Sequence, residues 1–185
     1  GAGIAGNAGT LTPATSYSQI VDLVVGTTAA TSDILNVARG VAFTGAGGNL
    51  TNANAVDLAV GQDGAVNLTA VAGGQVIVVA DAVNFIKFTN AATTATGVTA
   101  DAAFNSVIGA GTITSLSATA NVAVDILASF YDAANSQAVV GYIVSADTQI
   151  AAADQFNVLS TIAMTAADYA NFGANQVNIA VATVL

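Results

Sequence analysis

The stretch VAVDILASFYDAANSQAVVGYIV, residues 122–144, decides the fold of this chain. Two apolar runs rich in β-branched and aromatic residues flank Asp132–Ser136, whose small and polar residues are typical of a turn. The pattern predicts a β-hairpin whose strands cover Val122–Tyr131 and Gln137–Val144. Strands joined by such turns favour an antiparallel sheet.

Further strands are predicted on both sides of this hairpin. Apolar alternation predicts one strand over Tyr17–Val25 and two others over Phe156–Met164 and Val177–Leu185. The run QVIVVA at Gln75–Ala80 is the most β-branched segment of the chain, which predicts a central strand. The N-terminal strand would present four residues on one face, namely Tyr17, Val21, Leu23 and Val25.

Two short helices are predicted between the strands, over Thr99–Gly109 and Thr165–Gly173, each beginning at a threonine that can serve as N-cap. The predicted fold class is all-β, an antiparallel β-sandwich with two short helices. A β-solenoid is the alternative, although the chain shows no fixed repeat period. Residues 1–16 are predicted to be a flexible, glycine-rich segment, and residues 17–185 a single domain.

The composition excludes much catalytic chemistry. All eleven acidic residues are aspartates, and the chain has no histidine, cysteine or tryptophan. Imidazole bases, thiol nucleophiles and His or Cys metal ligands are therefore excluded. Asp125 with Asp132, or Asp147 with Asp154, could form the acid–base pair of a glycosidase, but aspartates in separate loops are more often turn residues. We expect no enzymatic activity.

The net charge of −9, with Arg39 and Lys87 as the only basic residues, argues against nucleic acid and anionic membranes as partners. The uncharged stretch Ala102–Val124 is too polar and too rich in glycine to insert into a membrane as a helix. Only 7% of the residues are charged, whereas an ordinary soluble domain has roughly 25%. Such a surface suits an extracellular assembly, so the expected partner is another copy of the chain.

Three motifs toward the C-terminal end resemble a known group of bacterial proteins. They are Tyr131-Asp132 followed by Gln137–Val140, the loop Ala146–Thr148 with Ala153-Asp154, and the run Met164–Tyr169. They are similar to C-terminal β domains of surface proteins exported by type I secretion, including RTX-like adhesins and calcium-dependent S-layer proteins. The resemblance extends over Ser129–Asn178, and SDILNV at Ser32–Val37 is similar to strands of the same proteins. It implies a secreted, cell-surface protein, although the family's G-G-x-G-x-D calcium repeats are absent.

Calcium is the expected cofactor, because carboxylate oxygens are the ligands that this cation prefers. The candidate ligands are Asp132 in the hairpin turn and Asp147 with Asp154 in the loop that follows. The alternative assigns all three aspartates to ordinary turn and cap roles.

The terminal strands are the candidate assembly elements, because an apolar strand at a chain end is an aggregation hazard unless it pairs. Strand exchange would insert Tyr17–Val25 into a neighbouring copy; alternatively, both terminal strands pair within their own domain. The predicted function is a structural subunit of an extracellular assembly, either a biofilm-matrix filament or a surface layer. The alternatives are an adhesin or carbohydrate-binding module for a cell-surface glycan and, from Thr112–Thr114 alone, an ice-binding surface.

Overall fold

The computed structural model describes residues 18–20, 23–26, 33–39, 64–65, 68–79, 83, 85–92, 99–115, 124–145 and 149–181. The predictions made for residues 1–16, Tyr17, Val21 and Asp147 lie outside these ranges.

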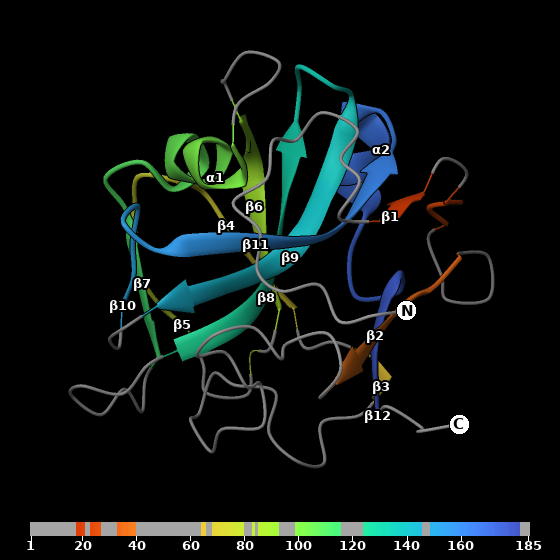
Figure 1. Cartoon of the computed structure of the whole chain (residues 1–185), viewed down its shortest axis with the longest axis horizontal. Coiled ribbons are helices and arrows are strands. Elements are labelled where there is room, and N and C mark those ends of the chain that lie inside the picture. Colours follow the sequence, from red (N-terminus) through yellow and green to blue (C-terminus); the bar gives the residue numbers. More distant parts are fainter. Residues whose placement is uncertain are drawn as a thin grey trace.

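A six-stranded sheet forms the centre of the molecule, in the order β1-β11-β9-β8-β6-β4 (Figure 1). Its strands are β1 (Ser18–Ile20), β4 (Leu68–Val71), β6 (Phe85–Ala92), β8 (Val124–Asp132), β9 (Gln137–Ser145) and β11 (Gln155–Ala163). β8, β9 and β11 form an antiparallel meander whose first turn is the predicted hairpin. The outer strands join in parallel, β6 to β8, β4 to β6 and β1 to β11, so the sheet is mixed.

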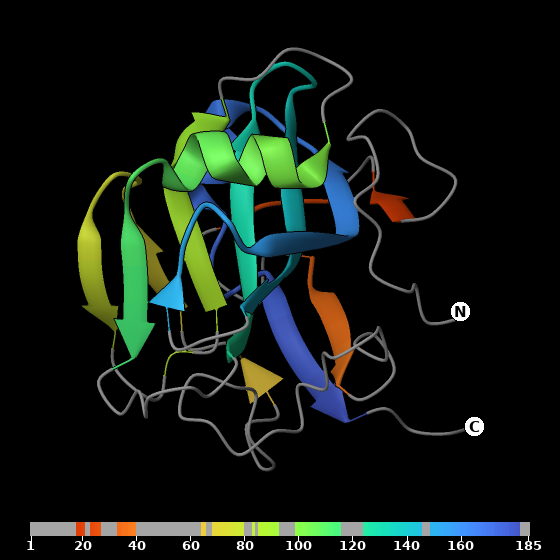
Figure 2. The same ribbon diagram turned by 60° about the vertical axis from the view of Figure 1, so that its left-hand side comes forward.

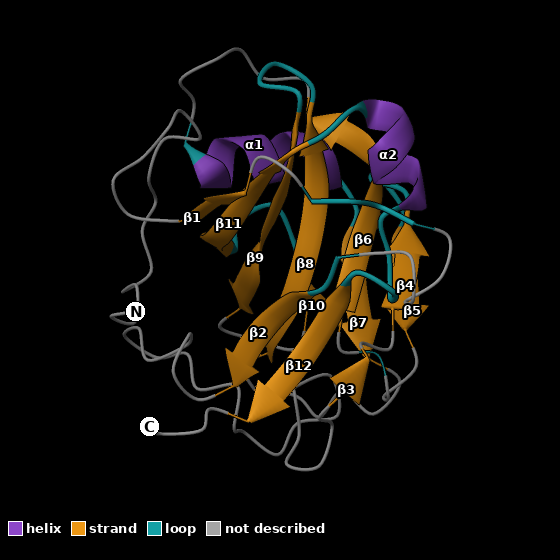
Figure 3. Cartoon of the chain, turned by 90° about the vertical axis from the view of Figure 1, so that its right-hand side faces the viewer, coloured by secondary structure: helices purple, strands orange, loops and turns teal. Residues whose placement is uncertain are grey.

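A helix and a three-stranded sheet cover each face of the central sheet. One cover consists of α1 (Ala100–Ile108) with β5 (Val76–Val79), β7 (Thr112–Ser115) and β10 (Gln149–Ile150) (Figure 2). The other consists of α2 (Ala166–Asn171) with β2 (Leu35–Arg39), β3 (Gly64–Ala65) and β12 (Val177–Val181) (Figure 3). The all-β sandwich with two short helices is therefore confirmed, but its sheets are mixed and not antiparallel as predicted, since β6 joins β8 and β5 joins β7 in parallel.

Side chains of the central strands alternate between two hydrophobic cores. On β8, Ile126 and Phe130 belong to the first core, which includes α1, whereas Leu127 belongs to the second core, which includes α2. Successive strand residues point to opposite faces, so a strand covered on both sides must be apolar throughout. This is the reason for the unbroken apolar run of β9, in which every residue except Val144 is buried.

Both helices begin where the sequence predicts. The side chain of Thr99 accepts a hydrogen bond from the Ala102 N–H, and Gly109 ends α1 with a positive φ of 57°. Thr165 and Asp168 form a capping box at the start of α2, in which each side chain accepts from the other residue's backbone N–H. Because the first N–H groups of a helix have no partner inside it, these side chains fix the two starting points.

The first core is centred on Phe156 of β11. Its ring stacks on Phe104 of α1 at 5.5 Å and meets Phe130 of β8 edge-on at 5.0 Å between centroids. The ring lies against Gly141 of β9, where an added Cβ would be 2.5 Å from Phe156 Cε1 and closer still to the Asn157 carbonyl oxygen. A glycine is therefore required in the middle of this buried strand.

One strand prediction is wrong, because the run Gln75–Ala80 does not form a central strand. Within it, β5 lies at the end of the order β10-β7-β5, and among the described residues β7 is its only strand neighbour. Four β-branched residues in a row indicate a strand but do not determine which strands pair with it. Because β5 lies at an edge of its sheet, its exposed side chains form a candidate surface for contact with another molecule.

Candidate functional site

Two exposed valines on β5 are the most solvent-accessible large apolar side chains that the structure describes. Val76 is 80% exposed and Val78 is 59% exposed. Ile77 between them points inward and packs, partly buried, against the first core. The alternation of a strand therefore directs one face of β5 into the protein and presents the two valines to solvent.

The residues beside these valines are polar but uncharged. Val76 pairs with Thr112 and Val78 with Thr114 on β7, and Thr114 pairs in turn with Gln149 on β10. We call Val76, Val78, Thr112, Thr114 and Gln149 the assembly face, which is the outer surface of the β10-β7-β5 sheet. Figure 2 shows β5 (yellow) beside β7 (green) at the left-hand side of the molecule.

The edge of β11, in contrast, is covered. β1 pairs with Ser160–Ile162, and further along the strand the Phe156 N–H donates to Asp101 Oδ1 of α1 at 2.7 Å. A carboxylate that occupies an edge N–H prevents another strand from pairing there. No such group occupies the β5 edge among the described residues, and the valines make that edge apolar.

The predicted calcium ligand Asp132 lies at the end of β8 and is buried. Its carboxylate accepts from the backbone N–H groups of Ala134 at 3.1 Å and Asn135 at 3.4 Å. It also accepts from the side-chain amides of Asn135 at 2.6 Å and Gln137 at 3.0 Å. These hydrogen bonds use the carboxylate to close the β8–β9 turn.

Asp154 belongs to a different turn, where its Oδ2 accepts from the Ala151 N–H at 2.7 Å. Asp132 pairs with Gln137 at one end of β9, whereas Gln155 pairs with Val144 near the other end. Seven residues of extended strand separate these points by roughly 24 Å, so the two aspartates cannot share one ion. Within the described ranges no three potential ligands cluster to hold a metal.

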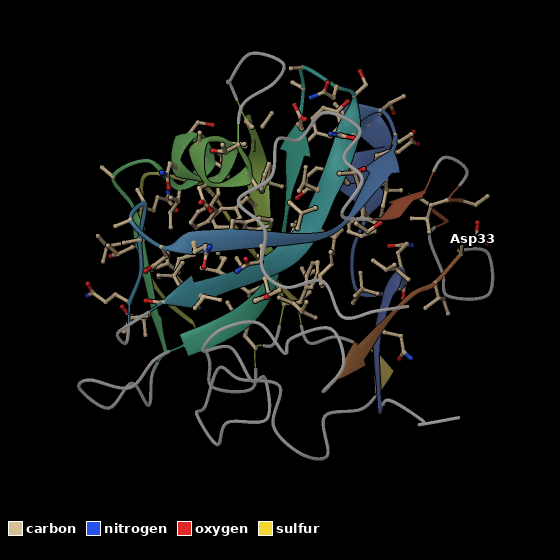
Figure 4. The ribbon with its side chains drawn as sticks, in the orientation of Figure 1. Asp33 is labelled. Atoms are coloured by element: carbon tan, nitrogen blue, oxygen red, sulfur yellow. The ribbon has the colours of Figure 1, made fainter. Side chains whose placement is uncertain are left out.

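The predicted assembly strand is placed in its own sheet. Ser18–Ile20 pairs in parallel with Ser160–Ile162 of the same chain, and Leu23 and Val25 lie outside any strand, packed against the second core. Asp33, labelled in Figure 4, lies near the start of β2. It accepts from the Val24 N–H at 2.8 Å and donates its own N–H to Val24 O at 2.9 Å. This contact joins the segment around Val24 to the start of β2.

A buried polar cluster lies on the second face of the central sheet. Lys87 Nζ donates to the carbonyls of Ala170 at 2.9 Å and Phe172 at 2.7 Å, at the end of α2, and lies 5.0 Å from the centre of the Tyr169 ring. The Tyr169 hydroxyl donates to Phe88 O at 2.9 Å and accepts from Ser129 Oγ at 3.1 Å. Burial lowers the pKa of Lys87 and raises the pKa of Tyr169 above its usual value of 10.

This cluster attaches α2 to the sheet, because its donors bind carbonyls of the protein itself. The sequence patterns considered above do not indicate this cluster. The available signal was Lys87, the only lysine of the chain, within the apolar run FIKF at Phe85–Phe88. A single charge in such a run is buried on one face of the strand and needs acceptors there.

We expect the stability of the protein to fall above pH 10 because of Tyr169. The unfolded chain loses the phenol proton near pH 10, whereas the folded chain keeps it, so rising pH favours unfolding. The expected slope approaches about 1.4 kcal/mol per pH unit. Lys87 opposes this slope, because burial lowers its pKa in the folded chain, and its contribution fades above pH 10.5 as the unfolded chain also loses the lysine proton.

Denaturant unfolding at pH 8 and between pH 10.5 and 11.5 measures this effect, with Tyr169→Phe as the control. The variant is expected to be less stable at pH 8, because Phe88 O loses its donor, and to show a shallower decline at high pH. Equal slopes for the two proteins would contradict the prediction.

Comparison with protein-family models, with curated proteins and with solved structures finds no match for this chain. The resemblance to type I-secreted surface proteins therefore stays a prediction from the sequence. No helix within the described ranges is long and apolar enough to cross a membrane.

Proposed function

We propose that this chain is a non-enzymatic structural subunit of an extracellular bacterial assembly, a biofilm-matrix filament or a surface layer, whose copies contact one another through their β-sheets. The observation that carries the proposal is the pair Val76 and Val78, which are 80% and 59% exposed on the assembly face. Apolar side chains gathered on an uncharged sheet edge favour contact with another protein surface over contact with water.

Charge supports the same location. Each copy carries a net charge of −9, so two copies repel each other over most orientations. The assembly face carries no charged side chain, since it consists of valine, threonine and glutamine. Contact between copies is therefore least opposed there, and salt that screens the remaining charge should promote assembly.

Electron microscopy of the purified chain, with calcium and with a chelator, tests the proposal. We expect ordered filaments or sheets from the wild type and their loss in a Val76→Asp/Val78→Asp double variant, which places negative charge on the face. Val24→Asp is the matched control, because Val24 is 57% exposed but lies outside the assembly face. Monomers of the wild type in both conditions would contradict the proposal and direct attention to the adhesin alternative, tested by a glycan screen.

Two further variants examine the other sequence-based predictions in the same experiment. If chelation abolishes the assembly, Asp154→Asn tests whether the loop that also holds Asp147 binds the calcium. Deletion of residues 1–25 tests strand exchange: polymers that persist without this segment would eliminate it as the exchanged strand.

A further inference from the structure

We propose that two copies of this chain pair through β5 in antiparallel orientation about a two-fold axis, which joins their β10-β7-β5 sheets into one six-stranded sheet. The inference rests on the proposed function and specifies the contact through which copies first associate. Three features carry it: the backbone groups that β5 presents, the register that satisfies them, and the side chains that this register brings together.

The hydrogen bonds to β7 determine which backbone groups of β5 are open. The Thr112 N–H donates to the Gln75 carbonyl at 3.0 Å, and β5 and β7 pair in parallel with Val76 opposite Thr112. In such a ladder, alternate residues of a strand direct both backbone groups to the same side. Gln75 and Ile77 therefore face β7, whereas the N–H and C=O groups of Val76 and Val78 face the opposite edge, where no strand of the described residues pairs.

One antiparallel register satisfies all of these open groups at once. If Val76 of one copy lies opposite Val78 of the other, each pair exchanges two N–H···O=C bonds, and the two-fold axis repeats the pair. Ile77 then lies opposite Ile77 of the second copy, on the axis. Shifting the strands by two residues leaves only one such pair, since the described strand ends at Val79.

The same register matches the faces of the two sheets. A two-fold axis perpendicular to the sheet keeps inner residues on the inner side and outer residues on the outer side. The exposed valines of both copies therefore come together as cross-strand pairs of β-branched residues, which favour strand pairing. Thr112 and Thr114 continue the same outer surface on both sides.

A second copy fits this edge better than a partner of different chemistry. A basic partner would bind the acidic surfaces that give the chain its charge of −9, and the assembly face offers it no carboxylate. A second copy of the same edge can pair through the backbone groups of Val76 and Val78 alone, because the register is self-complementary. Such a contact closes on itself, so it gives a dimer, and a filament or layer built from these dimers uses a second contact.

Single cysteine variants test the register, because the natural chain has no cysteine. Val76→Cys and Val78→Cys replace exposed residues, so both variants are expected to fold. We expect an equimolar mixture of the two to form a disulfide-linked dimer upon mild oxidation, while each variant alone gives much less. The expected pairs would place Cα atoms about 5.5 Å apart, a distance that a disulfide can span.

Val78→Pro provides a second measurement, by sedimentation over a range of concentrations. Proline removes an N–H that faces the open edge and does not serve the β7 ladder, so the fold should persist while the dimer dissociates. Efficient cross-linking of Val76→Cys with itself, or a dimer unaffected by Val78→Pro, would overturn the inferred pairing. If the mixed cysteine variants form filaments but give no disulfide-linked dimer upon oxidation, the inferred pairing is wrong while the proposed function stands. An entirely monomeric wild type would contradict both.

Discussion

Replacement of Phe156 by alanine is expected to lower the free energy of unfolding by about 3–5 kcal/mol. The Phe156 side chain is fully buried, and its ring contacts Phe104 on α1 and Phe130 on β8. The substitution removes both aromatic contacts and leaves a cavity between helix and sheet. Neighbouring Gly141 has no side chain that could move into the space.

Urea unfolding followed by far-UV circular dichroism measures this loss, at protein concentrations where the chain is monomeric. Phe156→Leu is the graded control, because it keeps an apolar side chain in the site and should cost less. Val78→Ala, at an exposed position, should change stability by less than about 0.5 kcal/mol. A loss below about 1 kcal/mol for Phe156→Ala would show that the aromatic cluster does not hold α1 on the sheet.

Local features of this fold could be predicted from the sequence. The β8–β9 hairpin and the starts of both helices depend on residues close together in the chain, such as Thr165 and Asp168 of the capping box. Short-range hydrogen bonds of this kind leave a recognisable pattern of residue types. The all-β class followed from the number of strand patterns and the hairpins between them.

Features that depend on distant partners could not be predicted in the same way. β6 pairs with β8 in parallel, although α1 and β7 lie between them in the sequence. Nothing in the sequence of either strand indicates that the other is its partner. The edge position of β5 is of the same kind, because its apolar residues resemble those of a buried strand. A strand's pattern records which residues are apolar, but exposure depends on the neighbours that the topology supplies.

The use of aspartate at five described positions has a structural explanation. Five aspartates accept hydrogen bonds from backbone N–H groups: Asp33, Asp101, Asp132, Asp154 and Asp168. Four of these bonds close turns or caps within a few residues or a short loop, where the short side chain of aspartate reaches the backbone without spare length. The composition that suggested cation ligands therefore also reflects the many turns of a fold built from short strands.

Gly141→Ala is expected to lower the free energy of unfolding by about 3 kcal/mol, at the upper end of the usual cost of overpacking a core. The new Cβ would lie 2.5 Å from Phe156 Cε1 and would also contact the Asn157 carbonyl oxygen. The contacts of the ring with Phe104 and Phe130 oppose its displacement, and the carbonyl belongs to the neighbouring strand β11. Relief therefore requires β9 and β11 to separate locally, near the irregular register between Val158 and Ser160.

A double-mutant cycle with Phe156→Leu distinguishes the two sources of this cost. If the ring contributes much of it, the double variant should be more stable than the sum of the single changes predicts, because leucine leaves room for the new methyl group. The Asn157 carbonyl stays in place, so rescue should be incomplete. Strictly additive losses would mean that the backbone contact alone excludes a side chain at residue 141, and a variant as stable as the wild type would show that β9 and β11 are packed less tightly than this structure has them.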